Sequence, residues 1–185
     1  MNALFIIGSA RKDGITAKLC DIVGSAIYDP TDMELTFVRP YDLDIRHCSG
    51  CGSCSRSGEC VINDDMELLY RLVEENDIIV LAVPVYFSGP SSVIKQMIDR
   101  FQCVWAAGVK KKNKIVALIV AGGNDSPVFS NTISIIKAFA ATIGAEWAGE
   151  LTVSGTDIIE DISDDLEKKT SNFGTGILSA HLRST

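Results

Sequence analysis

The chain has 185 residues, 46% of them hydrophobic, and 17 basic against 24 acidic side chains give it a net charge of −7. This length predicts one domain, residues 1–185, that buries a sizeable core without disulfides. The acidic balance argues against nucleic acid and anionic membranes as partners, because both attract basic surfaces. The apolar run at residues 3–7 is too short for a signal-peptide core, so we expect a cytoplasmic protein with reduced thiols.

Short apolar runs alternate with amphipathic segments along the chain. The apolar runs predict strands over residues 3–8, 34–38, 77–83, 114–120 and 146–153. Apolar residues spaced three and four apart predict helices over 16–28, 66–75, 92–103 and 164–182, and another between Pro127 and Gly144. Asp64, with Glu67 three residues later, is expected to cap the helix that starts at residue 66. This alternation predicts a parallel five-stranded sheet with helices on both faces.

The turn after the first strand has the features of a phosphate-binding segment. It spans residues 8–16 and leads directly into a helix, whose first N–H groups can hold an anion. Hydroxyl and guanidinium groups add further donors. The candidate phosphate-binding residues are Ser9, Arg11, Gly14, Ile15 and Thr16. The turn is neither a Walker A loop nor a G-x-G-x-x-G fingerprint, and an ordinary strand–helix turn is the alternative interpretation.

The turns after the third and fourth predicted strands should meet the first turn, because ligands of open α/β sheets bind at the carboxyl ends of the strands. Aromatic residues between prolines and glycine can form a platform for a flat heterocycle. Glycines after the next strand let a ligand approach the backbone. The candidate ring-binding residues are Pro84, Val85, Tyr86, Phe87, Ser88, Gly122 and Gly123. Simple core packing and a plain turn are the alternatives.

These segments together resemble the NAD(P)H-dependent FMN reductase superfamily. The resemblance rests on G-S-x-R-x-x-G-x-T, on P-V-Y-F-S-G-P with Lys95, Asp99 and Arg100 downstream, and on the Gly-Gly pair. It covers nearly the whole chain and fades beyond about Asp157. It implies a flavodoxin-like three-layer α/β sandwich of strand order 2-1-3-4-5 that binds FMN, with the phosphate on the first turn and the ring on the other two. Helix-end packing or an ion pair would also explain Asp99 and Arg100.

A loop without periodicity, residues 40–63, carries four cysteines. Cys48, Cys51, Cys54 and Cys60 are spaced closely enough to surround one metal centre, as compact ferredoxin runs do. The pattern resembles the cysteine motif of the iron–sulfur flavoproteins of anaerobes, which implies a 4Fe–4S cluster. An all-cysteine zinc site, a redox disulfide or cysteines without a metal remain open on spacing alone.

The resulting prediction is an FMN-dependent oxidoreductase that takes electrons from NAD(P)H or reduced ferredoxin. Its acceptors would be small molecules such as quinones or oxygen species, and a 4Fe–4S cluster would add one-electron steps. No side chain needs to act as an acid or base, because the flavin carries the chemistry. The alternatives are a non-enzymatic electron carrier, a cluster-free NAD(P)H-dependent FMN or quinone reductase, and a redox or metal sensor. The resemblance also implies a homodimer or homotetramer with small-molecule or protein redox partners.

Overall fold

The computed structural model describes residues 1–108, 110–123 and 128–184. Its strands are β1 (Asn2–Ile7), β2 (Glu34–Val38), β3 (Ile78–Tyr86), β4 (Gly89–Pro90), β5 (Ile115–Gly122) and β6 (Glu146–Ser154). Its α-helices are α1 (Ile15–Ile27), α2 (Cys54–Ser57), α3 (Met66–Glu75), α4 (Ser92–Arg100), α5 (Gln102–Ala107), α6 (Ser130–Thr142) and α7 (Asp164–Ser184), and a 3-10 turn covers Pro40–Asp42.

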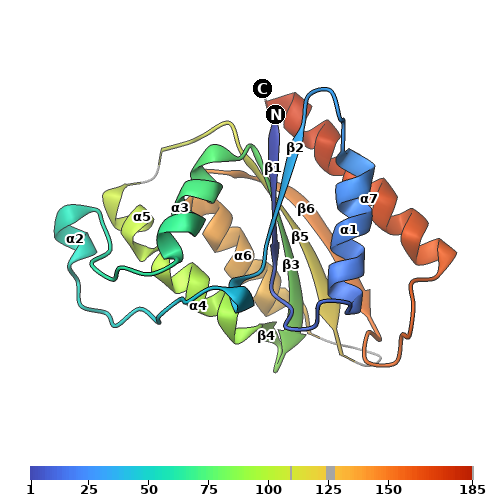
Figure 1. Cartoon of the computed structure of the whole chain (residues 1–185), viewed down its shortest axis with the longest axis horizontal. Coiled ribbons are helices and arrows are strands. Elements are labelled where there is room, and N and C mark those ends of the chain that lie inside the picture. The colour runs from blue at the N-terminus through green and yellow to red at the C-terminus, as the bar shows by residue number, and fades with distance from the viewer. Residues whose placement is uncertain (109, 124–127, 185) are drawn as a thin grey trace.

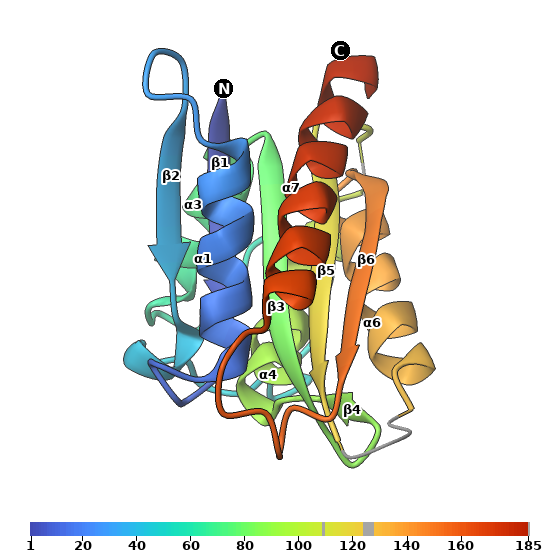
Figure 2. The same cartoon turned by 90° about the vertical axis from the view of Figure 1, so that its right-hand side faces the viewer.

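The sheet has the three-layer arrangement that the alternation predicted. Helices α1 and α7 cover one face, and α3, α4 and α6 cover the other (Figure 1). Figure 2 shows α1 and α7 side by side in front of the strands, whose carboxyl ends all lie at the lower edge. The order is β2-β1-β3-β5-β6, all parallel, which confirms the predicted order 2-1-3-4-5 for the parallel strands.

The predicted strand number needs one correction, because the sheet has a sixth strand. The two-residue β4 pairs antiparallel with the end of β3, and Val85 lies opposite Pro90. Phe87 and Ser88 reverse the chain between them with φ angles of 49° and 62°, a conformation that side-chain-bearing residues adopt rarely. A local turn, invisible to hydrophobic periodicity, therefore extends β3 into a hairpin at the lower edge of the sheet.

Burial follows the position of each strand in the sheet. β1, β3 and β5 lie inside and are buried over almost their whole length, whereas the edge strands β2 and β6 are partly exposed. Near-continuous aliphatic runs are typical of parallel strands covered on both faces. Phe5 of β1 stacks on Phe37 of the edge strand at 4.7 Å between ring centroids, which shields the sheet beside α1.

The prediction of one continuous helix over residues 92–103 is wrong, because the helix is interrupted. The chain forms α4 and α5 with a break at Phe101, whose ring is buried. Phe101 packs edge-to-face on Tyr70 at 5.1 Å and on Phe139 at 5.0 Å between centroids. These contacts come from α3 and α6, so tertiary packing decides the break.

The caps of two other helices also depend on details that spacing did not give. Asp65, not Asp64, is the N-cap residue of α3, and no side-chain capping bond forms there. The Asp64 carboxylate nevertheless accepts the Met66 N–H at 3.1 Å. Gly144 ends α6 as predicted with φ of 73°, where a Cβ atom would lie 2.0 Å from the Lys110 carbonyl oxygen. Pro127, expected in the first turn of that helix, lies outside the described residues.

None of the helices in the described part of the chain combines the length and hydrophobicity that a bilayer span requires.

Candidate functional site

A cleft of about 710 Å³ opens at the carboxyl ends of the parallel strands. The volume lies within the range of about 300–1,000 Å³ that is typical of cofactor sites. Turns after β1, β3, β5 and β6 form its walls, so segments distant in sequence meet at one edge of the sheet. The predicted residues that line it are Ser9, Arg11, Gly14, Ile15, Thr16, Pro84, Val85, Tyr86, Phe87, Gly122 and Gly123. Ser88 is not among the lining residues, although Phe87, its neighbour in the reverse turn before β4, is.

The turn after β1 presents backbone donors to the cleft. Gly14 is the N-cap residue of α1, and its carbonyl accepts the first intrahelical bonds from Ala17 and Lys18 at 2.9 and 3.1 Å. The N–H groups of Ile15 and Thr16 precede those bonds, so the helix itself gives them no acceptor. No acidic residue stands in the first turn of α1 to compete for them. This end of α1 can therefore take an anionic group.

Ser9 shapes this turn. Its buried hydroxyl accepts the Arg11 N–H at 3.2 Å and donates to the Arg11 carbonyl at 3.3 Å. These bonds hold the exposed Arg11 at the rim of the cleft, where its guanidinium can reach a ligand. Arg39, at the end of β2, donates to the Ala10 carbonyl at 2.8 Å and supports the turn from outside.

The turns after β3 and β5 form a second wall. Pro84 is buried, whereas Tyr86 and Phe87 are exposed at the end of β3. Gly122 packs so closely on β3 that a Cβ atom there would lie 3.2 Å from the backbone N and O of Val85. A side chain at this position would therefore push the two strand ends apart, which explains the glycine. Asn124, which follows the glycine pair, lies outside the described residues.

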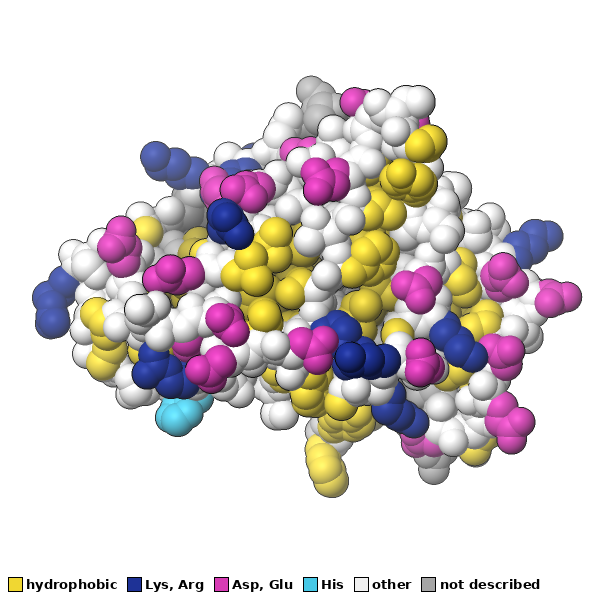
Figure 3. Space-filling view, in the orientation of Figure 1, with side chains coloured by type: hydrophobic (Ala, Val, Ile, Leu, Met, Phe, Trp, Pro, Cys, Tyr) yellow, Lys and Arg dark blue, Asp and Glu magenta, His cyan; other side chains and the backbone are white. Residues whose placement is uncertain are grey.

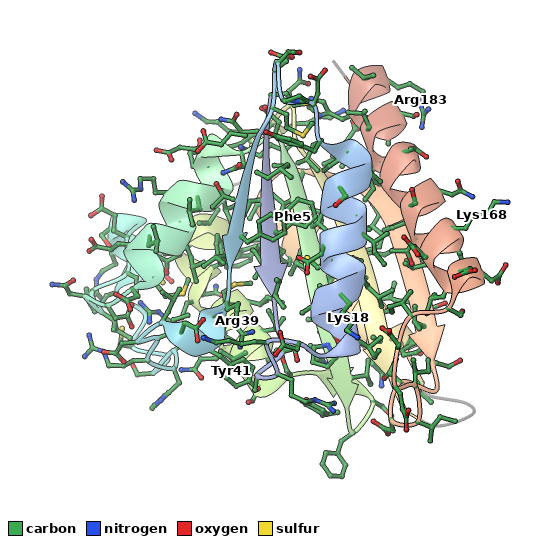
Figure 4. The ribbon with its side chains drawn as sticks, turned by 45° about the vertical axis from the view of Figure 1, so that its right-hand side comes forward. Phe5, Lys18, Arg39, Tyr41, Lys168 and Arg183 are labelled. Carbon is green, nitrogen blue, oxygen red and sulfur yellow. The ribbon has the colours of Figure 1, made fainter. Side chains whose placement is uncertain are left out.

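The turn after β6 is a part of the cleft that the sequence interpretation missed. Its lining residues are Thr156, Asp157, Ile159 and Glu160. An ion pair of 2.7 Å between Lys18 and Asp161 ties this segment to α1. In Figure 4, Lys18 lies at the lower end of α1, on the side that faces the turn before α7. The rule that identified the other strand ends also applies to the fifth parallel strand, and it would have found this turn.

The cleft combines charges of both signs. Arg11, Lys12 and Asp13 line it on the α1 side, which is therefore mainly basic, and Asp157 and Glu160 line it on the β6 side. Figure 3 shows basic side chains gathered at the lower centre of the molecule with acidic ones beside them. A monoanionic or dianionic group would fit the basic side, and the opposite wall offers acceptors to hydroxyl donors.

A second cavity, of about 220 Å³, lies in the cysteine loop (residues 40–63). All four predicted ligand residues line it: Cys48, Cys51, Cys54 and Cys60. Cys48 and Cys51 are exposed, and all six cysteines of the chain are free. Within the described residues, no three His, Cys, Asp or Glu side chains lie close enough together to hold a metal ion. The loop thus brings the thiols to one cavity without a closed ligand set.

One thiol in this cavity is predisposed to ionise. Hydrogen bonding between the Cys51 thiol and the Ser53 hydroxyl, 3.5 Å apart, lowers the pKa of Cys51. Thiolates are the form that binds metals. Burial instead raises the pKa of Cys20, a core residue of α1.

Arg100 lies at the wall of the cysteine cavity and forms a buried ion pair with Asp64 at 2.6 Å. Their side chains are 0% and 1% exposed. Burial alone would raise the pKa of Asp64, but hydrogen bonds from Arg100 and from the N–H groups of Arg46 and Met66 outweigh it and lower that pKa. Asp99 pairs with Lys95 on the surface at 2.5 Å. The ion-pair interpretation of Asp99 and Arg100 is therefore confirmed.

The basic run at residues 110–114 has structural contacts. Lys114 is buried and donates to the carbonyls of Glu74 and Asn76 at 2.5 and 2.7 Å. Lys111 pairs with Glu146 and Lys112 with Glu74. These contacts join the end of α3 and the start of β6 to the turn before β5.

Comparisons with known proteins agree with this geometry. The model of the NADPH-dependent FMN reductase family matches residues 1–155. An iron–sulfur flavoprotein of Archaeoglobus fulgidus is 31% identical over 182 residues, which cover 97% of this chain and 80% of that protein. An iron–sulfur flavoprotein of Methanocaldococcus jannaschii is 31% identical over 139 residues, or 75% of this chain and 71% of that protein.

Solved structures share the fold at lower identity. A flavone reductase superposes with a TM-score of 0.74 at 18% identity, and the match covers 98% of this chain but only 63% of that one. An NADH:FMN oxidoreductase superposes with a TM-score of 0.67 at 16% identity and covers 96% of this chain and 89% of that one. The chain thus spans slightly less than two thirds of the flavone reductase.

Proposed function

Because the chain belongs to the NADPH-dependent FMN reductase family, a family of flavin-dependent oxidoreductases, we propose that it binds one FMN in the strand-end cleft. In that site it would pass electrons from NAD(P)H or reduced ferredoxin to small acceptors such as quinones or oxygen species. The observation that carries this proposal is the convergence of the turns after β1, β3 and β5 on one cleft of suitable size.

The cleft offers a distinct part to each end of FMN. The phosphate would bind the N–H groups of Ile15 and Thr16, the Thr16 hydroxyl and the Arg11 guanidinium. The flat ring would lie against Tyr86 and the backbone at Gly122, where the absence of a side chain permits close approach. When bound, FMN supplies the electron-transfer chemistry, and the chain supplies binding, orientation and access. None of these residues needs to transfer a proton.

We further propose that Cys48, Cys51, Cys54 and Cys60 hold a 4Fe–4S cluster. Three observations support this: the four thiols line one cavity, one of them has a lowered pKa, and relatives covering most of the chain are named iron–sulfur flavoproteins. A cluster transfers single electrons, so together with FMN it would let the protein link two-electron and one-electron partners. A zinc site uses the same ligands and is an outcome of the test below.

The test is the visible spectrum of anaerobically purified protein, with flavin, iron and acid-labile sulfide measured on one sample. We expect one flavin with about four irons and four sulfides per chain. Cys51→Ser should lose the iron and keep the flavin. Cys103→Ala is the matched control, because Cys103 lines the same cavity but lies outside the cysteine run, and it should keep both.

Each negative outcome identifies the part of the proposal that fails. Flavin without iron or sulfide, after anaerobic reconstitution, would leave a cluster-free reductase or carrier. Zinc in place of iron would assign the loop a structural role. Failure to bind added FMN would refute the central proposal.

Turnover separates an enzyme from a carrier. We expect rapid flavin reduction by NADH or NADPH in anaerobic stopped flow. Rapid exchange with reduced ferredoxin alone would instead favour an electron carrier. That alternative is tested because the sequence has no dedicated nicotinamide fingerprint. We also propose a homodimer or homotetramer, which light scattering of the flavin-loaded protein would test.

A further inference from the structure

The two ends of the cysteine run are joined by one side chain from another element. Arg100, the last residue of α4, donates from Nη1 to the Arg46 carbonyl at 2.8 Å and from Nη2 to the Ile62 carbonyl at 3.2 Å. Arg46 precedes Cys48, and Ile62 follows Cys60. Arg100 therefore joins the two ends of the segment that contains all four cysteines. We call these two ends, Arg46 and Ile62, the neck of the loop.

Asp64 reinforces the same neck from the loop side. Its two carboxylate oxygens accept from Nη1 and Nη2 of Arg100 at 2.6 and 3.1 Å, and one also accepts the Arg46 N–H at 2.9 Å. A bidentate pair of this kind fixes the orientation of the guanidinium plane. Neither partner can rotate without breaking bonds to the backbone of the loop.

The guanidinium has one donor left over. Arginine carries five N–H groups, and the four on Nη1 and Nη2 correspond to the four contacts above. Its Nε atom is buried and has no hydrogen-bond partner among the described residues. Buried charged donors are rarely left unpaired in native proteins, because their desolvation is costly. This donor therefore indicates a group that completes it.

Arg100 lines the cavity that the four cysteines line. Burial alone would lower the pKa of Arg100, but the hydrogen bond to Asp64 outweighs it, and Tyr70 and Cys60 add smaller electrostatic contributions that raise it. The guanidinium thus stays charged at the wall of this cavity. The completing group would be anionic and sulfur-rich, as thiolates and inorganic sulfide are.

We infer that Arg100 is the positioning residue of the cysteine site: it clamps both ends of the loop and donates its Nε–H to a sulfur of the bound cluster. This inference rests on the proposed cluster. One-electron reduction adds one negative charge to the site and needs no proton, so a fixed cation with a hydrogen bond to sulfur favours the reduced form. Arg100 should therefore raise the reduction potential.

The test compares Arg100→Lys with wild type and with Arg56→Lys, the same exchange at an exposed position on α2 in the same loop. Flavin, iron and sulfide are counted in each protein, and the potential is measured by anaerobic titration with mediator dyes. Lysine keeps the charge but lacks the Nε–H and the fork. We expect an equilibrium constant for one-electron reduction about tenfold lower in Arg100→Lys, a shift of about 59 mV. Arg56→Lys should match wild type.

A spectroscopic measurement on the intact protein reads the contact directly. Pulsed EPR of the reduced protein, labelled with ¹⁵N at arginine Nε, should show a nitrogen coupling in wild type and in Arg56→Lys. Arg100→Lys should lack it. If Arg100→Lys fails to fold, persistence of the coupling in Arg46→Lys and Arg56→Lys decides, because Arg46 and Arg56 are the two arginines within the cysteine loop.

The outcomes separate this inference from the function on which it rests. An Arg100→Lys protein that holds the cluster with wild-type iron content, reduction potential and nitrogen coupling would overturn this inference alone. So would a cluster-containing wild type without the nitrogen coupling. A normal flavin content with a lower iron content in Arg100→Lys supports the role of Arg100 in clamping the loop. Wild type that binds FMN but no iron or sulfide after reconstitution overturns the cluster and this inference with it, and leaves the FMN site standing.

Discussion

The strand-end cleft and the cysteine loop are positioned by different forces. Backbone register places the cleft residues, because parallel strands end at one edge of the sheet and each turn starts where its strand stops. The cysteine loop has little regular structure, and a buried ion pair from α4 fixes its neck. The comparison suggests that the cleft tolerates many side-chain changes without losing its shape, whereas the loop depends on a few polar contacts.

The largest effect on stability is expected from Asp64→Ala, directly after the cysteine loop. The change leaves the buried Arg100 charge without its carboxylate, and such a loss costs about 3–5 kcal/mol. Urea denaturation followed by far-UV circular dichroism should show this decrease in the free energy of unfolding. A decrease below about 1 kcal/mol would mean that the loop neck does not depend on the pair.

Acid should remove the same contribution in the wild-type protein. The pKa of Asp64 is lowered on folding, so its stabilising contribution is complete above the unfolded value of about 3.9 and is lost as the pH falls through the folded value. The difference in unfolding free energy between wild type and Asp64→Asn should therefore be constant near pH 7 and shrink below about pH 4. A difference that grows on acidification would contradict this assignment.

A side-chain change in the cleft should alter the affinity for FMN and leave the fold unchanged. Thr16→Val keeps the shape of the side chain and removes the hydroxyl donor, and a hydrogen bond to a charged group is worth about 1.5–3 kcal/mol. Titration of FMN fluorescence should show affinity reduced about 10- to 100-fold. Thr142→Val is the control, because its hydroxyl bonds to the Ala138 carbonyl on α6, and it should bind FMN normally.

The smallest effect should come from the surface pair on α4. Lys95 and Asp99 are each about half exposed, and exposed pairs four residues apart contribute about 0.3–0.5 kcal/mol. Asp99→Asn should change the unfolding free energy by no more than this, and salt should abolish the difference. A loss as large as that of Asp64→Ala would show that burial does not distinguish the two pairs.

Much of the fold followed from patterns that are local in the sequence. The aliphatic runs of β1, β3 and β5 and the strand–helix alternation predicted the sheet, and the turns at residues 8–16 and 84–88 predicted where the cleft lies. Of the predicted binding residues, Ser88 is not among those that line the cleft, and its position depends on the reverse turn that follows β3. The turn at residues 156–160 carries neither a glycine pair nor a motif, so only its position after the fifth parallel strand would have identified it.

The order of the elements and the residues at the strand ends thus follow from the sequence alone. Hydrophobic periodicity is a local pattern, and a parallel sheet places every strand end at the same edge. Tertiary structure alone decided the break at Phe101, where rings from α3 and α6 meet, and the partnership of Arg100 with Asp64. These residues lie 36 positions apart, and only burial makes their pairing strong. Desolvation of a charge depends on everything packed around it, which no local pattern records.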